Sequence, residues 1–157
     1  MKTIYLGSDH AGFTLKEKVK TWLDKNRIPY EDCGNTILDK NDDYPDYAAK
    51  ASRKTVKFHS FGILFCGSAE GMCIAANKIK GARAVNPPDI LKAKLSREHN
   101  DANILCLGGG KTLQPQPGIP FSTATTMIWA FVTTPFSGES RHVRRLDKIR
   151  KLEMGKK

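Results

Sequence analysis

Residues 62–78 read GILFCGSAEGMCIAANK and join an apolar run, a loop with two glycines and a helical pattern. The run at 61–65 predicts a buried β-strand, and the spacing of apolar residues over 72–80 predicts a helix. A strand that leads through a short loop into a helix is the repeating part of a parallel βαβ unit. Cys66 follows the apolar run at the end of the strand, so its thiol is expected at the start of the loop.

The same alternation recurs along the chain. Short strands are also predicted at residues 3–6, 82–85 and 103–108. Helical patterns lie between and beyond these strands, at 14–26, 46–54, 90–99 and 123–132. Such alternation predicts an open, doubly wound α/β sheet. Ligands bind sheets of this kind beyond the carboxyl ends of the strands, which places loops 7–12 and 66–71 at the expected crevice.

The composition fits one domain, with 157 residues of which 39% are hydrophobic. The proline-rich stretch 114–120 is interpreted as a loop within that domain, and the residues beyond about Met154 are expected to fray. No stretch approaches the roughly 20 apolar residues of a membrane span, and the first residues resemble neither a signal peptide nor an anchor. The four cysteines lack the spacing of a zinc ribbon or a disulfide framework, which favours a reducing cytoplasm.

The chain carries a formal net charge of +10, and residues 141–157 hold eight Lys or Arg against two acidic residues. The excess fits attraction of small anions such as sugar phosphates, a polyanionic partner, or a solvated helix face. The sequence has neither the interleaved aromatic residues of a single-strand binder nor a helix-turn-helix signature. We therefore expect no nucleic-acid partner and no membrane partner.

Two loops carry candidate chemistry. GSDHAG at 7–12 places an acid, Asp9, and a titratable donor, His10, where free amides at a helix start attract an anion; alternatively, Asp9 caps the helix and His10 lies on the surface. In the second loop, the following helix can lower the pKa of Cys66 and make it a base or a nucleophile. The amides from Gly67 to Gly71 would then stabilise negative charge on a substrate oxygen.

Packing is the alternative for Cys66, because cysteine is often buried, and packing is the prediction for the other three cysteines, Cys33, Cys73 and Cys106. Two further candidates come later in the chain. His99 fits a general acid or base and Asn100 an oxygen-polarising donor, unless they merely form a polar helix end. Arg141 and Arg145 are four residues apart and share one helix face, which suits either a phosphate dianion or surface salt bridges.

Together these segments resemble a known family. GSDHAG, DYPDYA at 43–48, GILFCGSAEGMCIAANK, SREHNDANILCLG at 96–108 and RHVRR at 141–145 are similar to the matching blocks of the B-type ribose-5-phosphate isomerases. That family also contains galactose-6-phosphate isomerase subunits and allose-6-phosphate isomerases. The five blocks occur in order and cover nearly the whole chain.

The resemblance implies a cofactor-free and metal-free aldose–ketose isomerase with a Rossmann-like α/β/α domain. It implies a homodimer, or a dimer of dimers, with active sites shared between subunits. Cys66 matches the family's base, which moves a proton between two neighbouring carbons through an enediolate. The amides of the Gly67 to Gly71 loop would hold the charge of that intermediate, and Ser68 matches the hydroxyl beside the base.

The remaining site residues are carried over in the same way. Asp9 and His99 match residues associated with opening the furanose ring, and Asn100 matches one that contacts substrate near the reacting end. Three residues match family positions at the phosphate end of the substrate: His10, Arg141 and Arg145. The resemblance implies ribose 5-phosphate as substrate, with allose or galactose 6-phosphate, or a non-catalytic partner subunit, as the alternatives.

The chain departs from the family pattern at three places. Ala69 stands where the loop has a glycine, and its Cβ restricts the backbone there. Glu70 precedes by two residues the position, here Met72, at which one branch of the family carries a glutamate base. Gly110 stands at the place of a phosphate-binding arginine, with Lys111 beside it as a point charge without the bidentate fork.

Overall fold

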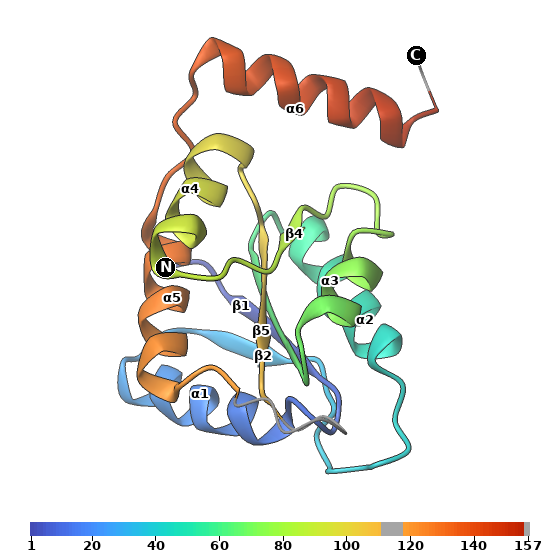
Figure 1. The fold of residues 1–157 in the computed structure, drawn as a ribbon, viewed down its shortest axis with the longest axis vertical. Helices are drawn as coiled ribbons and strands as arrows, with labels where there is room; N and C mark the ends of the chain where they lie inside the picture. Colours follow the sequence, from blue (N-terminus) through green and yellow to red (C-terminus); the bar gives the residue numbers. More distant parts are fainter. Residues whose placement is uncertain (111–117, 156–157) are drawn as a thin grey trace.

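The computed structural model describes residues 1–110 and 118–155, in which strands and helices alternate (Figure 1). The strands of this part of the chain are β1 (Ile4–Ser8), β2 (Tyr30–Asp32), β3 (Phe61–Cys66), β4 (Ala84–Val85) and β5 (Ile104–Gly108). The helices are α1 (Phe13–Lys25), α2 (Tyr44–Lys57), α3 (Glu70–Ala76), α4 (Ile90–Asn100), α5 (Phe121–Thr133) and α6 (Ser140–Glu153). None of these helices is long and apolar enough to cross a membrane.

All pairs in the sheet are parallel, and the strand order is β2-β1-β3-β5-β4. The chain leaves β1 toward β2 on one side and resumes at β3 on the other, so the winding reverses between β1 and β3. In such sheets the ligand crevice lies at this switch point, beyond the carboxyl ends of the strands. The predicted doubly wound α/β fold is confirmed, and its switch point is flanked by the two loops that carry Asp9 and Cys66.

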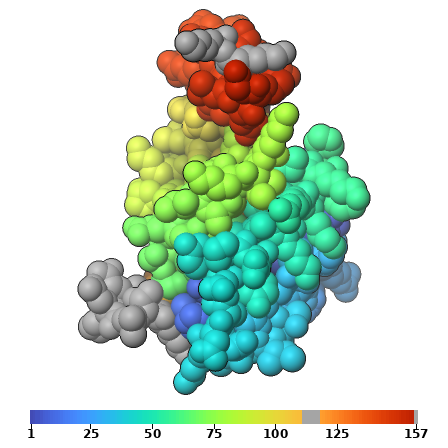
Figure 2. All heavy atoms as spheres, turned by 90° about the vertical axis from the view of Figure 1, so that its right-hand side faces the viewer, coloured from blue at the N-terminus to red at the C-terminus, as the bar shows by residue number. Residues whose placement is uncertain are grey.

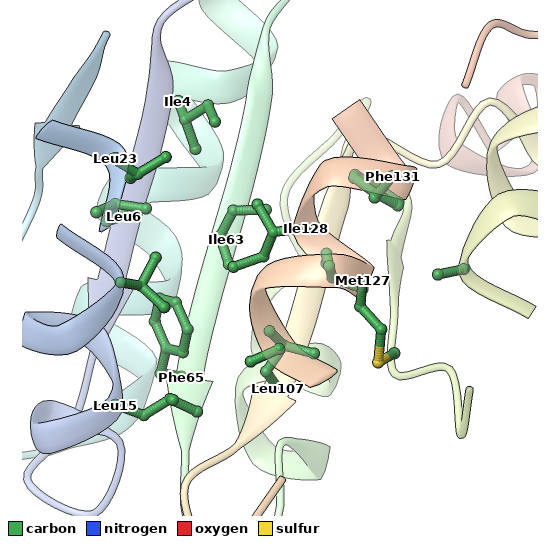
Figure 3. Close-up of a cluster of buried hydrophobic side chains, with 14 of the residues drawn as sticks. Ile4, Leu6, Leu15, Leu23, Ile63, Phe65, Leu107, Met127, Ile128 and Phe131 are labelled. Atoms are coloured by element: carbon green, nitrogen blue, oxygen red, sulfur yellow. The ribbon is translucent and has the colours of Figure 1, made fainter. Parts of the chain in front are cut away.

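Two apolar layers cover the faces of the sheet. One layer packs β1, β3 and β5 against α1, α4 and α5, and Figure 3 shows Leu15 and Leu23 on one side of it and Ile128 and Phe131 on the other. The opposite face packs against α2 and α3. Side chains alternate along β3, so Phe65 enters the first layer and Cys66 the second, toward α3. The three-layer sandwich thus fixes the direction of the Cys66 side chain.

One strand, β2, was not predicted from the sequence. β2 reads Tyr-Glu-Asp, lies at the sheet edge and has no apolar run, but its Asp32 carboxylate binds the ammonium group of Lys16 at 2.6 Å. The Lys16 side chain is fully buried, so this partner offsets the cost of burying its charge. Burial acts to raise the pKa of Asp32, but hydrogen bonds from Lys16 and Lys20 outweigh it and lower that pKa.

Other predicted bounds differ by a few residues. α3 ends at Ala76, although the apolar pattern extends to residue 80. The basic segment after residue 140 forms α6, whose apolar Val143, Ile149 and Leu152 are exposed. Most of the loop predicted at 114–120 and the end of the fraying tail lie outside the described residues.

The loops after β1 and β3 touch backbone to backbone at Gly12. A Cβ added there would lie 2.3 Å from the carbonyl carbon and oxygen of Phe65 and 2.6 Å from the amide nitrogen of Cys66. All three atoms belong to the rigid end of β3, so no flexible side chain can yield. This contact sets how closely the first turn of the chain approaches the Cys66 strand.

The variant Gly12→Ala is expected to lose about 3 kcal/mol of unfolding free energy, the upper range for overpacking a rigid site. Urea unfolding followed by circular dichroism measures this loss. Gly138→Ala is the control, because Gly138 has a φ of +66° but nothing within 4 Å of the added Cβ, and it should lose only about 1 kcal/mol. Equal losses in the two variants would contradict the proposed steric role of Gly12.

Candidate active site

Three loops meet beyond the carboxyl ends of β1, β3 and β5. The Gly109 amide donates a hydrogen bond to the Cys66 carbonyl oxygen at 2.6 Å, and the Gly110 amide donates one to the Gly67 carbonyl oxygen at 3.0 Å. The Asp9 amide donates to the carbonyl oxygen of Phe65 at 3.3 Å. Backbone hydrogen bonds therefore hold the loops in fixed positions, and Asp9 and Cys66 are brought to one place.

Cys66 is only 4% exposed, and its sulfur accepts a hydrogen bond from the Ala69 amide at 3.1 Å. Burial raises the pKa of the thiol, and the negative charge of Asp9 adds to the increase. Hydrogen bonds from the amides of Met72, Ala69 and Ser68 oppose these effects, but the net pKa is raised rather than lowered as the helix start suggested. Desolvation exceeds the effect of the amides, although these amides do point at the sulfur.

The loop keeps a glycine-like backbone at Ala69, where φ is +73° and ψ is −20°. This left-handed conformation costs a residue with a Cβ about 1 kcal/mol. It directs the Ala69 amide at the Cys66 sulfur, so the departure at residue 69 strains the loop without opening it. Ser68 and Glu70 are exposed, and the Glu70 amide donates to the Ser68 hydroxyl at 3.4 Å.

Asp9 is buried and accepts a hydrogen bond from the Gly12 amide at 2.8 Å. Asp9 thus binds the turn before α1, but it does not cap the helix as the alternative predicted, because Gly12 is the N-cap and no side chain of the described residues forms a cap hydrogen bond there. Burial raises its pKa, and the charge of Asp42 raises it further, whereas the Gly12 amide and His10 lower it. A carboxyl group with a raised pKa retains its proton closer to neutral pH and can act as an acid.

His10 lies at the mouth of the same site and is bound by a residue that the sequence analysis missed. Its ring Nδ1 lies 2.6 Å from a carboxylate oxygen of Asp42, which is in the loop between β2 and α2. Tyr44, from the DYPDYA block, borders the site as well, because its ring leaves only 2.9 Å to a Cβ added at Gly71. No spacing rule links residue 10 to residue 42, so only the fold reveals the pair.

His99 and Asn100 do not join this cluster within one chain. They end α4, directly before the amino end of β5, whereas Cys66 pairs with Gly108 at the carboxyl end of that strand. The five residues of β5 alone separate the amino and carboxyl ends of this strand by roughly 13 Å. Figure 1 accordingly places the end of α4 beside α6, at the opposite end of the molecule from the site.

The two predicted arginines also lie at that far end, on α6, which forms one extremity of the molecule in Figure 2. Arg141 and Arg145 are exposed and one helical turn apart, as predicted, and Arg141 Nε lies 2.8 Å from a Glu139 carboxylate oxygen. Between them in the sequence, buried His142 packs against His99 with ring centroids 4.5 Å apart and ring planes tilted by 37°. Burial lowers the pKa of His142, and its Nδ1 lies 2.7 Å from the Ser137 hydroxyl.

The other predictions have mixed outcomes. Cys33 and Cys106 are buried in the apolar layers as expected, and Cys73 is half-buried on α3. Lys111 lies outside the described residues, so its contribution stays a prediction. Within 1–110 and 118–155, no three His, Cys, Asp or Glu side chains gather to hold a metal ion.

Known proteins resemble this chain over almost its whole length. Residues 4–149 match the family model described as Ribose/Galactose Isomerase. The ribose-5-phosphate isomerase B of Mycolicibacterium paratuberculosis is 40% identical over 151 residues, which cover 96% of this chain and 91% of that protein.

Solved structures give the same result. The ribose 5-phosphate isomerase of Thermotoga maritima superposes with a TM-score of 0.86 at 42% identity, covering 95% of this chain and 97% of that one. The ribose-5-phosphate isomerase B of Mycoplasma genitalium, solved with bound ribulose-5-phosphate, has a TM-score of 0.87 at 36% identity and covers 97% and 96%.

The pKa directions predict the order in which the cysteines react. The hydrogen bond with Cys106 lowers the pKa of half-buried Cys73, whereas burial raises that of Cys66. Because the thiolate is the nucleophile, iodoacetamide at pH 7 should modify Cys73 about tenfold or more faster than Cys66. Modification of Cys66 should accelerate as the pH rises through 9. Peptide mass spectrometry of the folded protein measures both rates, and Cys66 reacting first at pH 7 would contradict the prediction.

Proposed function

The chain belongs to the ribose/galactose isomerase family, and on that premise we propose that it interconverts ribose 5-phosphate and ribulose 5-phosphate with Cys66 as the base. It is an aldose–ketose isomerase, and the choice of sugar and the chemical roles of residues are the proposal. The observation that carries the proposal is the Cys66 sulfur at the sheet's switch point, facing the amides of its own loop.

The reaction moves one proton between neighbouring carbons of the open-chain sugar. The Cys66 thiolate removes the proton from the carbon next to the carbonyl, the electrons pass to the carbonyl oxygen, and an enediolate forms. The thiol then returns the proton to the neighbouring carbon, while the hydroxyl proton on the second oxygen of the enediolate passes to the former carbonyl oxygen, which completes the ketose. A base near the reacting carbon and fixed amides near the oxygen are what this step requires.

The loop from Gly67 to Gly71 supplies these amides. Two of its backbone N–H groups, those of Ser68 and Ala69, already point toward the sulfur together with that of Met72 on α3, and a thiolate and an enediolate oxygen call for the same kind of donor. Ser68 stands exposed beside them, in reach of a substrate hydroxyl in the crevice. Because these donors are backbone groups, they are preorganised and require no rearrangement when charge develops.

Opening of the furanose ring precedes isomerisation and needs a proton on the ring oxygen. Asp9 fits the role of proton carrier, because burial raises its pKa. It also lies close enough to Cys66 for its charge to affect the thiol. His99 is the second member of this pair and Asn100 the donor near the reacting end. Both residues lie at the other edge of the sheet in the same chain.

This separation leads us to propose that a second copy completes the site. A neighbouring subunit would bring His99, Asn100, Arg141 and Arg145 to the crevice of the first, where His10 also faces the phosphate end. The exposed apolar side chains of α6 support this arrangement, because exposed apolar side chains on a helix with little of its own domain against it favour an interface. The proposed assembly is a homodimer, alone or within a dimer of dimers.

Replacing the proposed base tests the function directly. Cys66→Ala should lower the turnover of ribose 5-phosphate about 10³-fold, as expected for loss of a positioned general base. Cys73→Ala is the matched control and should stay within about threefold of the original rate, since its thiol lies on α3 away from the loop. The formation of ribulose 5-phosphate is followed by absorbance, with allose and galactose 6-phosphate tested in parallel. No turnover of any of the three sugars, or full turnover by Cys66→Ala, would refute the proposal.

Shared sites are tested by mixing two inactive variants. Cys66→Ala and His99→Asn, co-expressed, should regain about a quarter of the original activity, because half of the dimers are mixed and each mixed dimer has one intact site. Each variant alone serves as the control. Sedimentation velocity reports whether dimers form at all. Formation of mixed dimers without recovery of activity would show that His99 and Cys66 do not serve one site across subunits.

A further inference from the structure

The Asp42 carboxylate is engaged with His10 through two hydrogen bonds. One carboxylate oxygen of Asp42 accepts from the His10 backbone amide at 3.1 Å and lies 2.6 Å from the ring Nδ1. The Asp42 side chain is 2% exposed, whereas that of His10 is 39% exposed. A buried carboxylate therefore holds a histidine whose ring is partly exposed to solvent.

Asn35 fixes the other oxygen of this carboxylate. Its side-chain amide donates to Asp42 at 2.7 Å, and its own side-chain oxygen accepts from the Ile37 amide at 2.7 Å. The backbone amide of Asn35 donates to the Ser8 carbonyl oxygen at 2.9 Å, at the end of β1. The set of Asn35, Asp42 and His10 is thus anchored to the strand from which His10 itself emerges, and the Asp42 carboxylate has little freedom to move.

The charge state of Asp42 decides the tautomer of His10. Burial acts to raise the pKa of Asp42, but hydrogen bonds from Asn35 and His10 outweigh it and lower that pKa, so the group is a carboxylate at neutral pH. A carboxylate only accepts, and His10 Nδ1 must therefore carry a proton. The other ring nitrogen, Nε2, has no hydrogen-bond partner among the described residues. Nε2 donates a hydrogen bond only when the ring is protonated.

Other titratable groups around the pair favour the same state. Asp9 precedes His10 in the turn and adds a second acidic group, although burial raises its pKa. Tyr47, on α2, lies near Asp42, and burial and the charge of Asp42 raise its pKa, so it stays neutral. The charges that face the ring are therefore negative, and negative charge stabilises an imidazolium.

We propose that Asp42, held by Asn35, is a positioning residue that fixes the orientation of the His10 ring and keeps the proton of Nδ1 toward Asp42, so that the protonated ring presents its Nε2–H to a phosphate oxygen of the substrate. The proposal rests on the function proposed above, which places the phosphate end of the sugar at His10. It adds two residues, Asp42 and Asn35, to the groups that determine substrate affinity.

The test compares Asp42→Asn with Asp39→Asn over pH 6 to 8.5. Asp39 is the matched control, an exposed aspartate of the same loop whose carboxylate accepts from the Asn41 amide and does not contact His10. Calorimetry gives the affinity for inorganic phosphate, and steady-state kinetics give KM and kcat for ribose 5-phosphate. Ionisation of phosphate itself cancels in the ratio of variant to original protein.

Asp42→Asn should bind phosphate at least tenfold more weakly at pH 6, because the released ring no longer aims its Nε2–H at the anion, and the loss should become smaller toward pH 8.5, because only the protonated ring has a proton on Nε2. KM should rise in parallel while kcat changes less than threefold, and Asp39→Asn should change neither. An equal loss of affinity at every pH would mean that Asp42 is only structural and would overturn the proposal. Unchanged affinity at pH 6 would overturn it as well.

Two features keep the test decisive. Phosphate binding is measured without turnover, so a failure of the proposed isomerase reaction leaves this comparison intact. If Asp42→Asn does not fold, nitrogen-15 NMR of the original protein reports the protonation of the His10 ring. We expect Nδ1 protonated throughout the pH range and Nε2 as the nitrogen that titrates. A neutral ring with its proton on Nε2 would overturn the proposal.

Discussion

The close backbone contact at Gly12 is the constraint on which the site depends. Because the residue has no Cβ, the turn after β1 can lie against the carbonyl group of Phe65 and the amide of Cys66. That approach brings the buried Asp9 close enough to Cys66 to raise the pKa of its thiol. It also fixes where α1 begins and where His10 emerges. The adjacency of acid and thiol is therefore a property of the backbone and follows from one missing side chain.

Burial and the nearby acid favour the neutral thiol of Cys66, the proposed base, over its thiolate. Burial raises the pKa of both Cys66 and Asp9, and each negative charge disfavours the other. The amides of the loop counter this effect at the sulfur, and Ala69 tolerates a left-handed backbone to aim one of them. A strained residue at such a place indicates that the surrounding fold outweighs the local preference. The departure from glycine at residue 69 thus leaves the direction of the amide intact.

Much of this arrangement was predictable from sequence because it depends on local patterns. Apolar runs marked four of the five described strands, and the Cys66 loop follows directly from the strand that carries it. β2 escaped because its stability comes from edge pairing and from the Lys16–Asp32 contact rather than from apolar residues. Asp42 was not predicted for a related reason: its hydrogen bonds join it to a residue 32 positions away, and no periodic sequence pattern marks such a contact. His142 was visible within RHVRR, but its packing against His99 requires knowing how α6 meets α4.

The residues of the predicted site are divided between the carboxyl ends and the amino ends of the strands, and this division has a physical consequence. Parallel strands place every loop that follows them at one edge, so residues that precede β5 cannot reach Cys66 along their own chain. His99, Arg141 and Arg145 lie instead on or beside α6, a helix that exposes apolar side chains and packs mainly on α4. An interface that buries those side chains would supply α6 with the packing that stabilises helices in proteins. In the proposed assembly, the same contact would deliver a second set of charges to the crevice, so that association and catalytic competence would be one event.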